Sequence, residues 1–284
     1  MRRGCCHFVG GIAALVLLTG CGDPDRPGKL DSAAPFLTSL NLNNGPSPDP
    51  AHLPRSEFVL LQGVSDTAWP RIRSTYSTNG YATCWRSPTG PGPGMKDSAD
   101  PGRLAVIARA DVSPQVVSNL TFRIEGNEYA PSHPPVHVSF TNATGRSFRF
   151  WNLHMHSKAW HPAGQHEVRR NEARLAWQEV RKQTKSHPGE VVLIGATMND
   201  DPGSAAVDYF TNNSIANMQD VRPIHEADGS AWTHHQEEDD HWVRHDYLFV
   251  RIPESSTGSP RPPISSLGER RSDGIRRSLH LDLP

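Results

Sequence analysis

The chain has 284 residues, with 29 Lys or Arg against 30 Asp or Glu, so its formal net charge is −1. This balance excludes a global basic field that would attract nucleic acid, and an aromatic content of 7% argues against an extended stacking platform for single strands. The length allows one large domain or two small ones, and 25 prolines and 23 glycines predict long loops.

The N-terminus has the pattern of an export signal. Arg2 and Arg3 precede the apolar stretch HFVGGIAALVLLTG, which is too short to span a bilayer comfortably. The stretch ends in LLTGC, which resembles the bacterial lipoprotein lipobox, where the cysteine is acylated and becomes the mature N-terminus. We therefore expect a signal peptide over 1–20 and a lipid on Cys21 that holds the exported protein at a membrane of the bacterial cell envelope. The alternative is an ordinary signal peptide with a chance cysteine at its end.

The expected processing leaves Cys84 as the one cysteine without lipid, because Cys5 and Cys6 would leave with the signal. No intramolecular disulfide is then available, so the exported domain must depend on its apolar core. The segment GDPDRPGKLDSAAP after Cys21 has few apolar residues and three prolines. This composition predicts a tether over 21–34, followed by one globular domain over 35–284.

Strand patterns dominate the first half of that domain. PFLTSLNLNNG and SEFVLLQGV predict strands, and SDTAWPRIRSTYSTNG predicts a helix that begins at cap-type residues. YATCWRSP, RLAVIARADV and SNLTFRIEGN follow as expected strands. PVHVSF and RSFRFWNLHMHS then alternate on the two sides of a turn that ends in Gly145, which indicates a hairpin.

The second half contains the clearest helix, GQHEVRRNEARLAWQEVRKQTKSHPG. Val168, Leu175, Ala176 and Val180 form one apolar stripe among charged residues. The apolar run VVLIGAT comes next and predicts a buried strand that stops at the turn NDDPGS. A helix near SAAVDYFTNN, a polar loop, the strand WVRHDYLFVRI and a final strand RSLHLDL complete the chain. This mixture indicates an α/β or α+β class with two layers of sheet.

Several of these segments, in this order, resemble the endonuclease/exonuclease/phosphatase superfamily, the fold of pancreatic deoxyribonuclease and its relatives. FVLLQGVSD is similar to LLLQEVSD, FRFWNLHMHSKA to VVNVHLKSKG, and IGATMNDDPGS to AGDFNDDPGS. FLTSLNLNN, RLAVIAR, RRNEARLAWQEV, WTHHQEEDDHWVRHDYLFV and RRSDGIRRSLHLDL also resemble family segments. The resemblance covers about residues 35–284 and implies a four-layered αββα sandwich of two mixed β-sheets flanked by helices.

In active members of this superfamily, Mg²⁺ or Mn²⁺ stabilises the charge that develops on a phosphoester, and a histidine works with carboxylates to activate water. The resemblance implies that five functional positions are retained in this chain: Asn41, His154, Asn199, Asp246 and Asp273. Among these, Asn41 and Asp273 would be the remnant of the metal site. Three further positions depart from the family, where a Glu, an Asp and a His are replaced by Gly63, Thr197 and Gly274. The arginine that commonly precedes the hairpin corresponds to His133.

These departures remove the groups that the family chemistry needs. Gly63 offers no side-chain oxygen, Thr197 cannot ionise and Gly274 cannot transfer a proton, and Mg²⁺ binds weakly without carboxylates. Each loss alone would lower the rate by roughly 10²–10⁴. We therefore expect a membrane-anchored, non-catalytic binding module. Its expected ligand class contains phosphate, and the sequence names no protein partner.

Three alternatives remain open. The first is a divalent-metal-dependent phosphodiesterase, nuclease or phosphatase with residual or altered activity. The second is a histidine-rich metal-binding lipoprotein, because His154 and His156 lie two apart and four more histidines lie among acidic residues in 234–245; a polar, solvated loop is the plainer interpretation of that segment. The third is a misalignment around Gly63, which Glu57 and Asp66 flank.

Overall fold

The computed structural model describes residues 36–42, 53–88, 102–157, 163–212, 218–221, 233–236, 241–253 and 279–281. The expected signal peptide, the tether and the lipid site at Cys21 lie outside these residues, and so do Asp273 and Gly274. Within the described part of the chain, no helix is long and apolar enough to cross a membrane.

The first sheet is built from five strands: β1 (Leu37–Asn41), β2 (Phe58–Val64), β3 (Thr83–Arg86), β4 (Arg103–Ala108) and β15 (Leu279–Leu281). Their order is β15-β1-β2-β4-β3, with β1 and β2 parallel and the other neighbours antiparallel. Every residue of β2 is buried, as expected for a strand with apolar side chains on both faces.

The second sheet is built from six strands: β5 (Gln115–Val116), β8 (Val136–Thr141), β9 (Ser147–His154), β10 (Val191–Thr197), β11 (Gln219–Asp220) and β14 (Asp246–Arg251). Their order is β11-β14-β10-β9-β8-β5, and β9 and β10 are parallel. The expected hairpin is the antiparallel pair β8–β9, in which Val138 lies opposite Phe150 and Phe140 opposite Phe148. Both sheets are therefore mixed.

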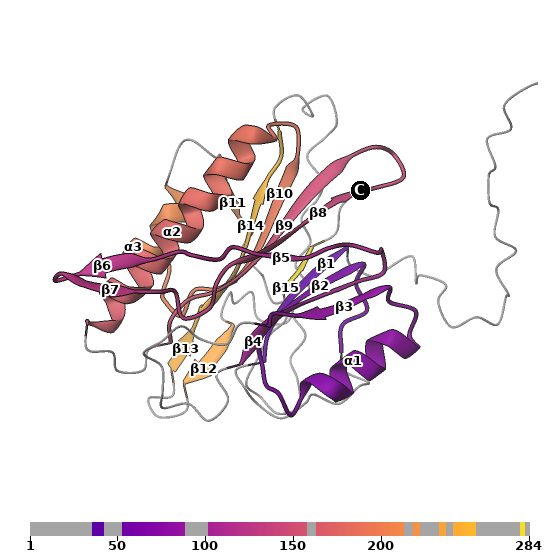
Figure 1. The fold of residues 1–284 in the computed structure, drawn as a ribbon, viewed down its shortest axis with the longest axis horizontal. Coiled ribbons are helices and arrows are strands. Elements are labelled where there is room, and N and C mark those ends of the chain that lie inside the picture. Colours follow the sequence, from indigo (N-terminus) through magenta and orange to yellow (C-terminus); the bar gives the residue numbers. More distant parts are fainter. Residues whose placement is uncertain are drawn as a thin grey trace, which may run out of the picture.

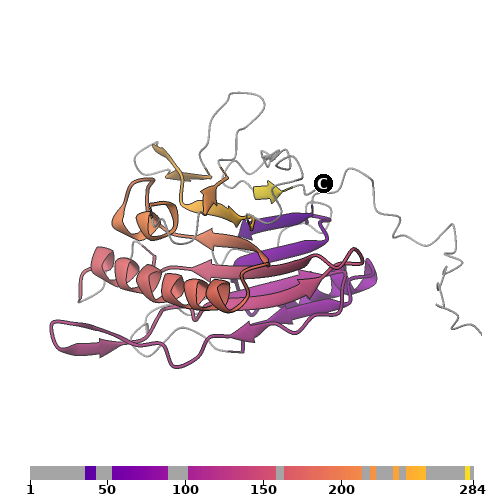
Figure 2. The same ribbon diagram turned by 90° about the horizontal axis from the view of Figure 1, so that it is seen from above.

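The two sheets pack face to face, and helices cover their outer faces (Figures 1 and 2). Phe58 and Leu60 of β2 pack in the core between the sheets, whereas Val59 and Leu61 of the same strand pack against α1 (Trp69–Thr78). On the other side, α2 (Gln165–Ser186) and α3 (Ala205–Thr211) cover the second sheet. The expected stripe of α2 is buried. The four-layered αββα sandwich is confirmed.

Two short antiparallel pairs differ from the sequence expectation. The segment SNLTFRIEGN is not one strand: β6 (Phe122–Ile124) turns at Glu125 and Gly126, whose φ angles are 49° and 83°, into β7 (Asn127–Tyr129). Positive φ at two successive residues is typical of a tight hairpin turn. The second pair is β12 (His234–Gln236) with β13 (His241–Val243). β12 lies in the region expected to be a polar loop, whereas β13 overlaps the start of the expected strand WVRHDYLFVRI, which the structure divides at Arg244 and His245 into β13 and β14.

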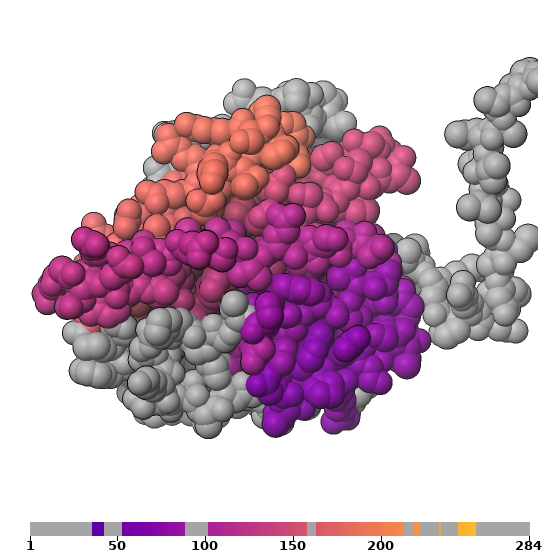
Figure 3. All heavy atoms as spheres, in the orientation of Figure 1, coloured from indigo at the N-terminus to yellow at the C-terminus, as the bar shows by residue number. Residues whose placement is uncertain are grey.

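The β6–β7 hairpin packs on the N-terminal half of α2. Phe122 of the hairpin contacts Val168 and Leu175 of the helix in a small apolar cluster of their own. In Figure 3 the magenta segment that includes this hairpin runs across the visible face to the left edge of the molecule. The hairpin is therefore an addition beside the sandwich and not a strand of either sheet.

Candidate functional site

The strand ends of the second sheet bring three of the expected positions together. Thr197, the last residue of β10, lies opposite His154 at the end of β9 and opposite Asp246 at the start of β14. All three side chains are buried. In the first sheet, Asn41 ends β1 and lies opposite Gln62 of β2, which places Gly63 at the same edge.

The two sheets meet closely just below these strand ends. Gln62 Nε2 donates hydrogen bonds to Ser39 Oγ (3.1 Å) and to Asn152 Oδ1 across the interface (2.6 Å). Asn152 Nδ2 donates in return to the carbonyl of Leu61 at 3.0 Å. Gly195 is required at this approach, because a Cβ there would lie 2.5 Å from Ser39 Oγ. We name the six positions at or next to these strand ends the strand-end site: Asn41, Gly63, His154, Thr197, Asn199 and Asp246.

Thr197 engages the remaining carboxylate of this site. Its Oγ1 donates a hydrogen bond to Asp246 Oδ1 at 2.7 Å, and Thr197 is completely buried. The backbone N–H groups of His245 and Asp246 both donate to Thr233 Oγ1 at 3.0 Å, which fixes the start of β14. A hydrogen bond to an ionised acceptor is among the stronger ones in a protein. The uncharged hydroxyl of Thr197 therefore stabilises the neighbouring carboxylate of Asp246.

Gly63 has a backbone conformation that suits glycine. Its φ is 62°, and the β2–β4 register shifts between Leu61 and Val64, so the strand bulges here. The left-handed region costs a residue with a Cβ roughly 1–2 kcal/mol, and a glycine in this conformation is typical of one kind of β-bulge. The backbone at position 63 is therefore shaped around a glycine.

His154 is held as a neutral imidazole. Burial holds its pKa well below the usual range, and the neighbouring His133 and His156 lower that pKa further. Its ring stacks on the ring of His133 with centroids 4.3 Å apart and planes 5° from parallel. Its Nδ1 is buried, and among the described residues no group hydrogen-bonds to it. The two imidazole rings therefore lie flat against each other.

Asn199 supports the turn that follows β10. It has a φ of 52°, a conformation that asparagine tolerates better than most residues, and its Nδ2 donates to the carbonyl of Met155 at 2.8 Å. The next residue, Asp200, makes an ion pair with Arg169 of α2 at 3.4 Å. Arg169 is completely buried. The NDD turn is therefore fixed to both the end of β9 and helix α2.

A buried carboxylate of α2 fixes the loop before the hairpin. Glu172 accepts hydrogen bonds from Ser132 N (2.6 Å), Ser132 Oγ (2.7 Å) and His156 N (2.6 Å). Burial raises the pKa of Glu172, and these hydrogen bonds oppose that rise. His156 lies beyond the end of β9, and its Nδ1 is 3.1 Å from Ser132 Oγ. Neither Arg169 nor Glu172 stood out in the sequence, because their partners lie far along the chain.

The described residues hold no group of three or more His, Cys, Asp or Glu side chains that could bind a metal ion. Asp273, the second expected metal position, lies outside them, as does Gly274. His245 is buried, with its Nε2 3.9 Å from Asp201 Oδ1. Glu57 and Asp66, the alternatives to a carboxylate at Gly63, instead face Arg109 (4.0 Å) and Arg103 (3.4 Å).

Comparison with known proteins gives structural relatives only. No family model matches the sequence, and no curated protein matches it. An endonuclease/exonuclease/phosphatase family protein from Leptotrichia buccalis aligns with a TM-score of 0.57 and 11% identity over 87% of this chain and 99% of that one. A family structure from Bacteroides vulgatus aligns with a TM-score of 0.54 and 18% identity, over 87% and 98%. The mannosyl-6-phosphatase of Bacteroides thetaiotaomicron aligns with a TM-score of 0.51 and 15% identity, over 87% and 100%. The chain therefore has the endonuclease/exonuclease/phosphatase fold.

Proposed function

We propose that this domain is a non-catalytic binding module built on a hydrolase fold. The observation that carries the proposal is the hydrogen bond from Thr197 to Asp246. In active members of the superfamily this strand end presents an aspartate, and an ionised carboxylate there can polarise water or hold a metal. A buried threonine hydroxyl that already donates to Asp246 does neither.

The described residues do not fit the divalent metal of the family. Mg²⁺ prefers oxygen ligands that carry negative charge, and it gives up its water reluctantly. Asp246 is the one carboxylate among the described positions of the strand-end site, and one of its oxygens accepts the Thr197 hydroxyl. Gly63 contributes no oxygen, and its positive φ disfavours the glutamate that would. These residues therefore support no metal-assisted step.

The state of His154 also supports the proposal. A general base works as one of a pair, in which a second group orients the ring and stabilises its charged form. The buried Nδ1 of His154 has no such partner among the described residues, and the ring stacks on another imidazole. Protonation of this ring would place a charge beside His133 in a buried site, which is unfavourable.

We further propose that the module is attached to a bacterial membrane through a lipid on Cys21. The support is the sequence LLTGC after a basic and apolar N-terminus. A Cys21→Ser variant is expected to move from the membrane fraction to the soluble fraction, and globomycin is expected to block processing of the wild type. Unchanged fractionation and processing in both experiments would refute the anchor and leave the binding proposal untouched.

The test of the main proposal is a hydrolysis assay on the full-length protein, with pancreatic deoxyribonuclease as the active control. The substrates are DNA, RNA and bis-(p-nitrophenyl) phosphate, each with Mg²⁺ and with Mn²⁺. We expect no turnover above the buffer rate. Turnover that disappears in a His154→Ala variant would contradict the proposal and establish a residual hydrolase. We also propose that the ligand of the strand-end site carries a phosphate group, because the resemblance implies that Asn41 and His154 are retained there.

A further inference from the structure

A polar hollow lies on the outer side of α2, between the β6–β7 hairpin and α3. It has a volume of about 290 Å³, which is the lower end of the range for small-molecule sites. Its polar lining includes Arg123, Glu167, Arg170, Asn171, Arg174 and Tyr209. A second hollow of about 260 Å³ continues past Arg170 and Tyr209 to Ala205 and Asp208. None of these residues belongs to the strand-end site.

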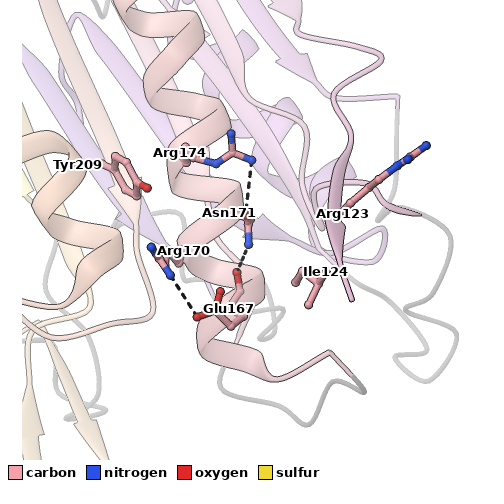
Figure 4. A pocket seen from close by; sticks show the side chains of 7 residues that line it. All are labelled: Arg123, Ile124, Glu167, Arg170, Asn171, Arg174 and Tyr209. Atoms are coloured by element: carbon pink, nitrogen blue, oxygen red, sulfur yellow. Dashed lines mark hydrogen bonds and ion pairs between the residues drawn. The ribbon is translucent and has the colours of Figure 1, made fainter. Parts of the chain in front are cut away.

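Two of the three cations that line this hollow, Arg170 and Arg174, lie on one face of α2, and the third, Arg123, lies on β6. Arg170 and Arg174 are four residues apart, so they are neighbours on the helix surface, and like charges at this spacing destabilise a helix. Figure 4 shows Tyr209 on α3 directed toward α2 on the side of Arg170, and Arg170 interacts with the Tyr209 side chain. Arg170, Arg174 and Tyr209, whose side chains all carry hydrogen-bond donors, therefore line the same hollow, with Arg174 directed toward Asn171 (Figure 4).

The carboxylates of the described residues neutralise little of the positive charge on Arg170 and Arg174. Arg170 is 3.3 Å from Glu167, but both side chains are more than half exposed, and such exposed pairs contribute little. Arg174 donates to the neutral Asn171 Oδ1 at 3.2 Å, and no carboxylate of the described residues pairs with it within 4.0 Å. The Arg123 side chain extends away from α2 in Figure 4 and is 3.5 Å from Glu128.

We propose that this hollow, which we name the α2–α3 anion site, binds a small molecule through a phosphate or carboxylate group held by Arg170, Arg174 and Tyr209. Planar guanidinium groups offer paired N–H donors that match the oxygens of either anion. An anion between the two arginines would also relieve their mutual repulsion. The proposal is independent of whether the strand-end site binds or hydrolyses anything.

The test is isothermal titration of the full-length protein at low ionic strength with pyrophosphate and, separately, with citrate. We expect at least one of them to bind, and the one that binds tighter identifies phosphate or carboxylate as the preferred group. Arg170→Gln and Arg174→Gln are each expected to weaken binding by roughly tenfold or more, because each removes a charged hydrogen-bond donor. Arg174→Lys, which keeps the charge but loses the paired donors, is expected to lie between wild type and Arg174→Gln.

Lys182→Gln is the matched control, because it removes one positive charge from an exposed residue of the same helix outside the hollow. It should change the affinity by less than about twofold. Absence of binding by both anions would overturn the proposal, and so would equal weakening by Lys182→Gln and Arg174→Gln. Loss of binding in His154→Gln with normal binding in both arginine variants would place the anion at the strand-end site and would also overturn it.

Discussion

Thr197→Asp introduces the aspartate that the resemblance implies for active relatives at the end of β10, and its cost in stability follows from the geometry. Thr197 Oγ1 lies 2.7 Å from Asp246 Oδ1 in a fully buried position. The substitution removes a hydrogen bond to a charged group, worth roughly 1.5–3 kcal/mol. It also adds a second carboxylate about 4 Å from the first, whose repulsion is up to about 4 kcal/mol at an effective dielectric constant near 20.

Proton uptake by one carboxyl limits the combined cost, because two carboxylates that share a site do not both stay ionised. We therefore expect Thr197→Asp to lower the free energy of unfolding by about 3–5 kcal/mol at neutral pH. For a domain of this size that corresponds to a fall in Tm of roughly 6–20 °C. The penalty should shrink as the pH falls, since a proton shared between the carboxyls removes the repulsion.

The assay is urea and thermal unfolding of Thr197→Asp beside Thr197→Asn, at neutral pH and near pH 5, in chelator. The asparagine variant has nearly the same size but no charge, and its amide can donate to Asp246. It should lose less than half as much stability, and the gap between the variants should narrow near pH 5. If Thr197→Asp is as stable as Thr197→Asn at neutral pH without metal, the described contact between Thr197 and Asp246 is wrong.

Three further predictions follow from the same structure. Gly63→Ala should cost about 1–2 kcal/mol in urea unfolding because of its positive φ, whereas Gly189→Ala, whose added Cβ meets open space, should be nearly neutral. Arg169→Gln should cost roughly 3–5 kcal/mol, because it leaves the carboxylate of the NDD turn without its buried partner; Lys182→Gln on the same helix should cost little. Burial and a nearby guanidinium lower the pKa of His137 to about 4, so stability should fall as the pH drops from about 6.5 toward 4, and His137→Gln should flatten that part of a pH series of unfolding curves.

The order of elements was predictable because local patterns dictate it. The apolar stripe of α2 and the pairing of Val138 with Phe150 follow from periodicity, and both are confirmed. The β6–β7 turn has a local signal in the sequence, because Gly126-Asn127 is a turn-type dipeptide that follows the run FRI. The prediction of one strand over that stretch is wrong, because apolar residues alone do not show where the chain reverses.

The contacts that shape the strand-end site were not predictable, because they join residues distant in sequence. The Thr197–Asp246 hydrogen bond spans 49 positions, and the Glu172–Ser132 bond spans 40. The resemblance predicts that Gly63 stands where active relatives have a glutamate, but it does not predict the positive φ at that position. Backbone conformation at a bulge depends on how two strands pair, which a single segment does not encode.

The central proposal is that the strand-end site binds no divalent metal. The most direct measurement is a crystal of the full-length protein soaked in Mn²⁺, with the anomalous signal used to locate bound ions. We predict no ordered ion within coordination distance of Asn41 or Asp246. An ordered Mn²⁺ between those two side chains would contradict the claim and would show that the site keeps its metal without the carboxylates at 63 and 197.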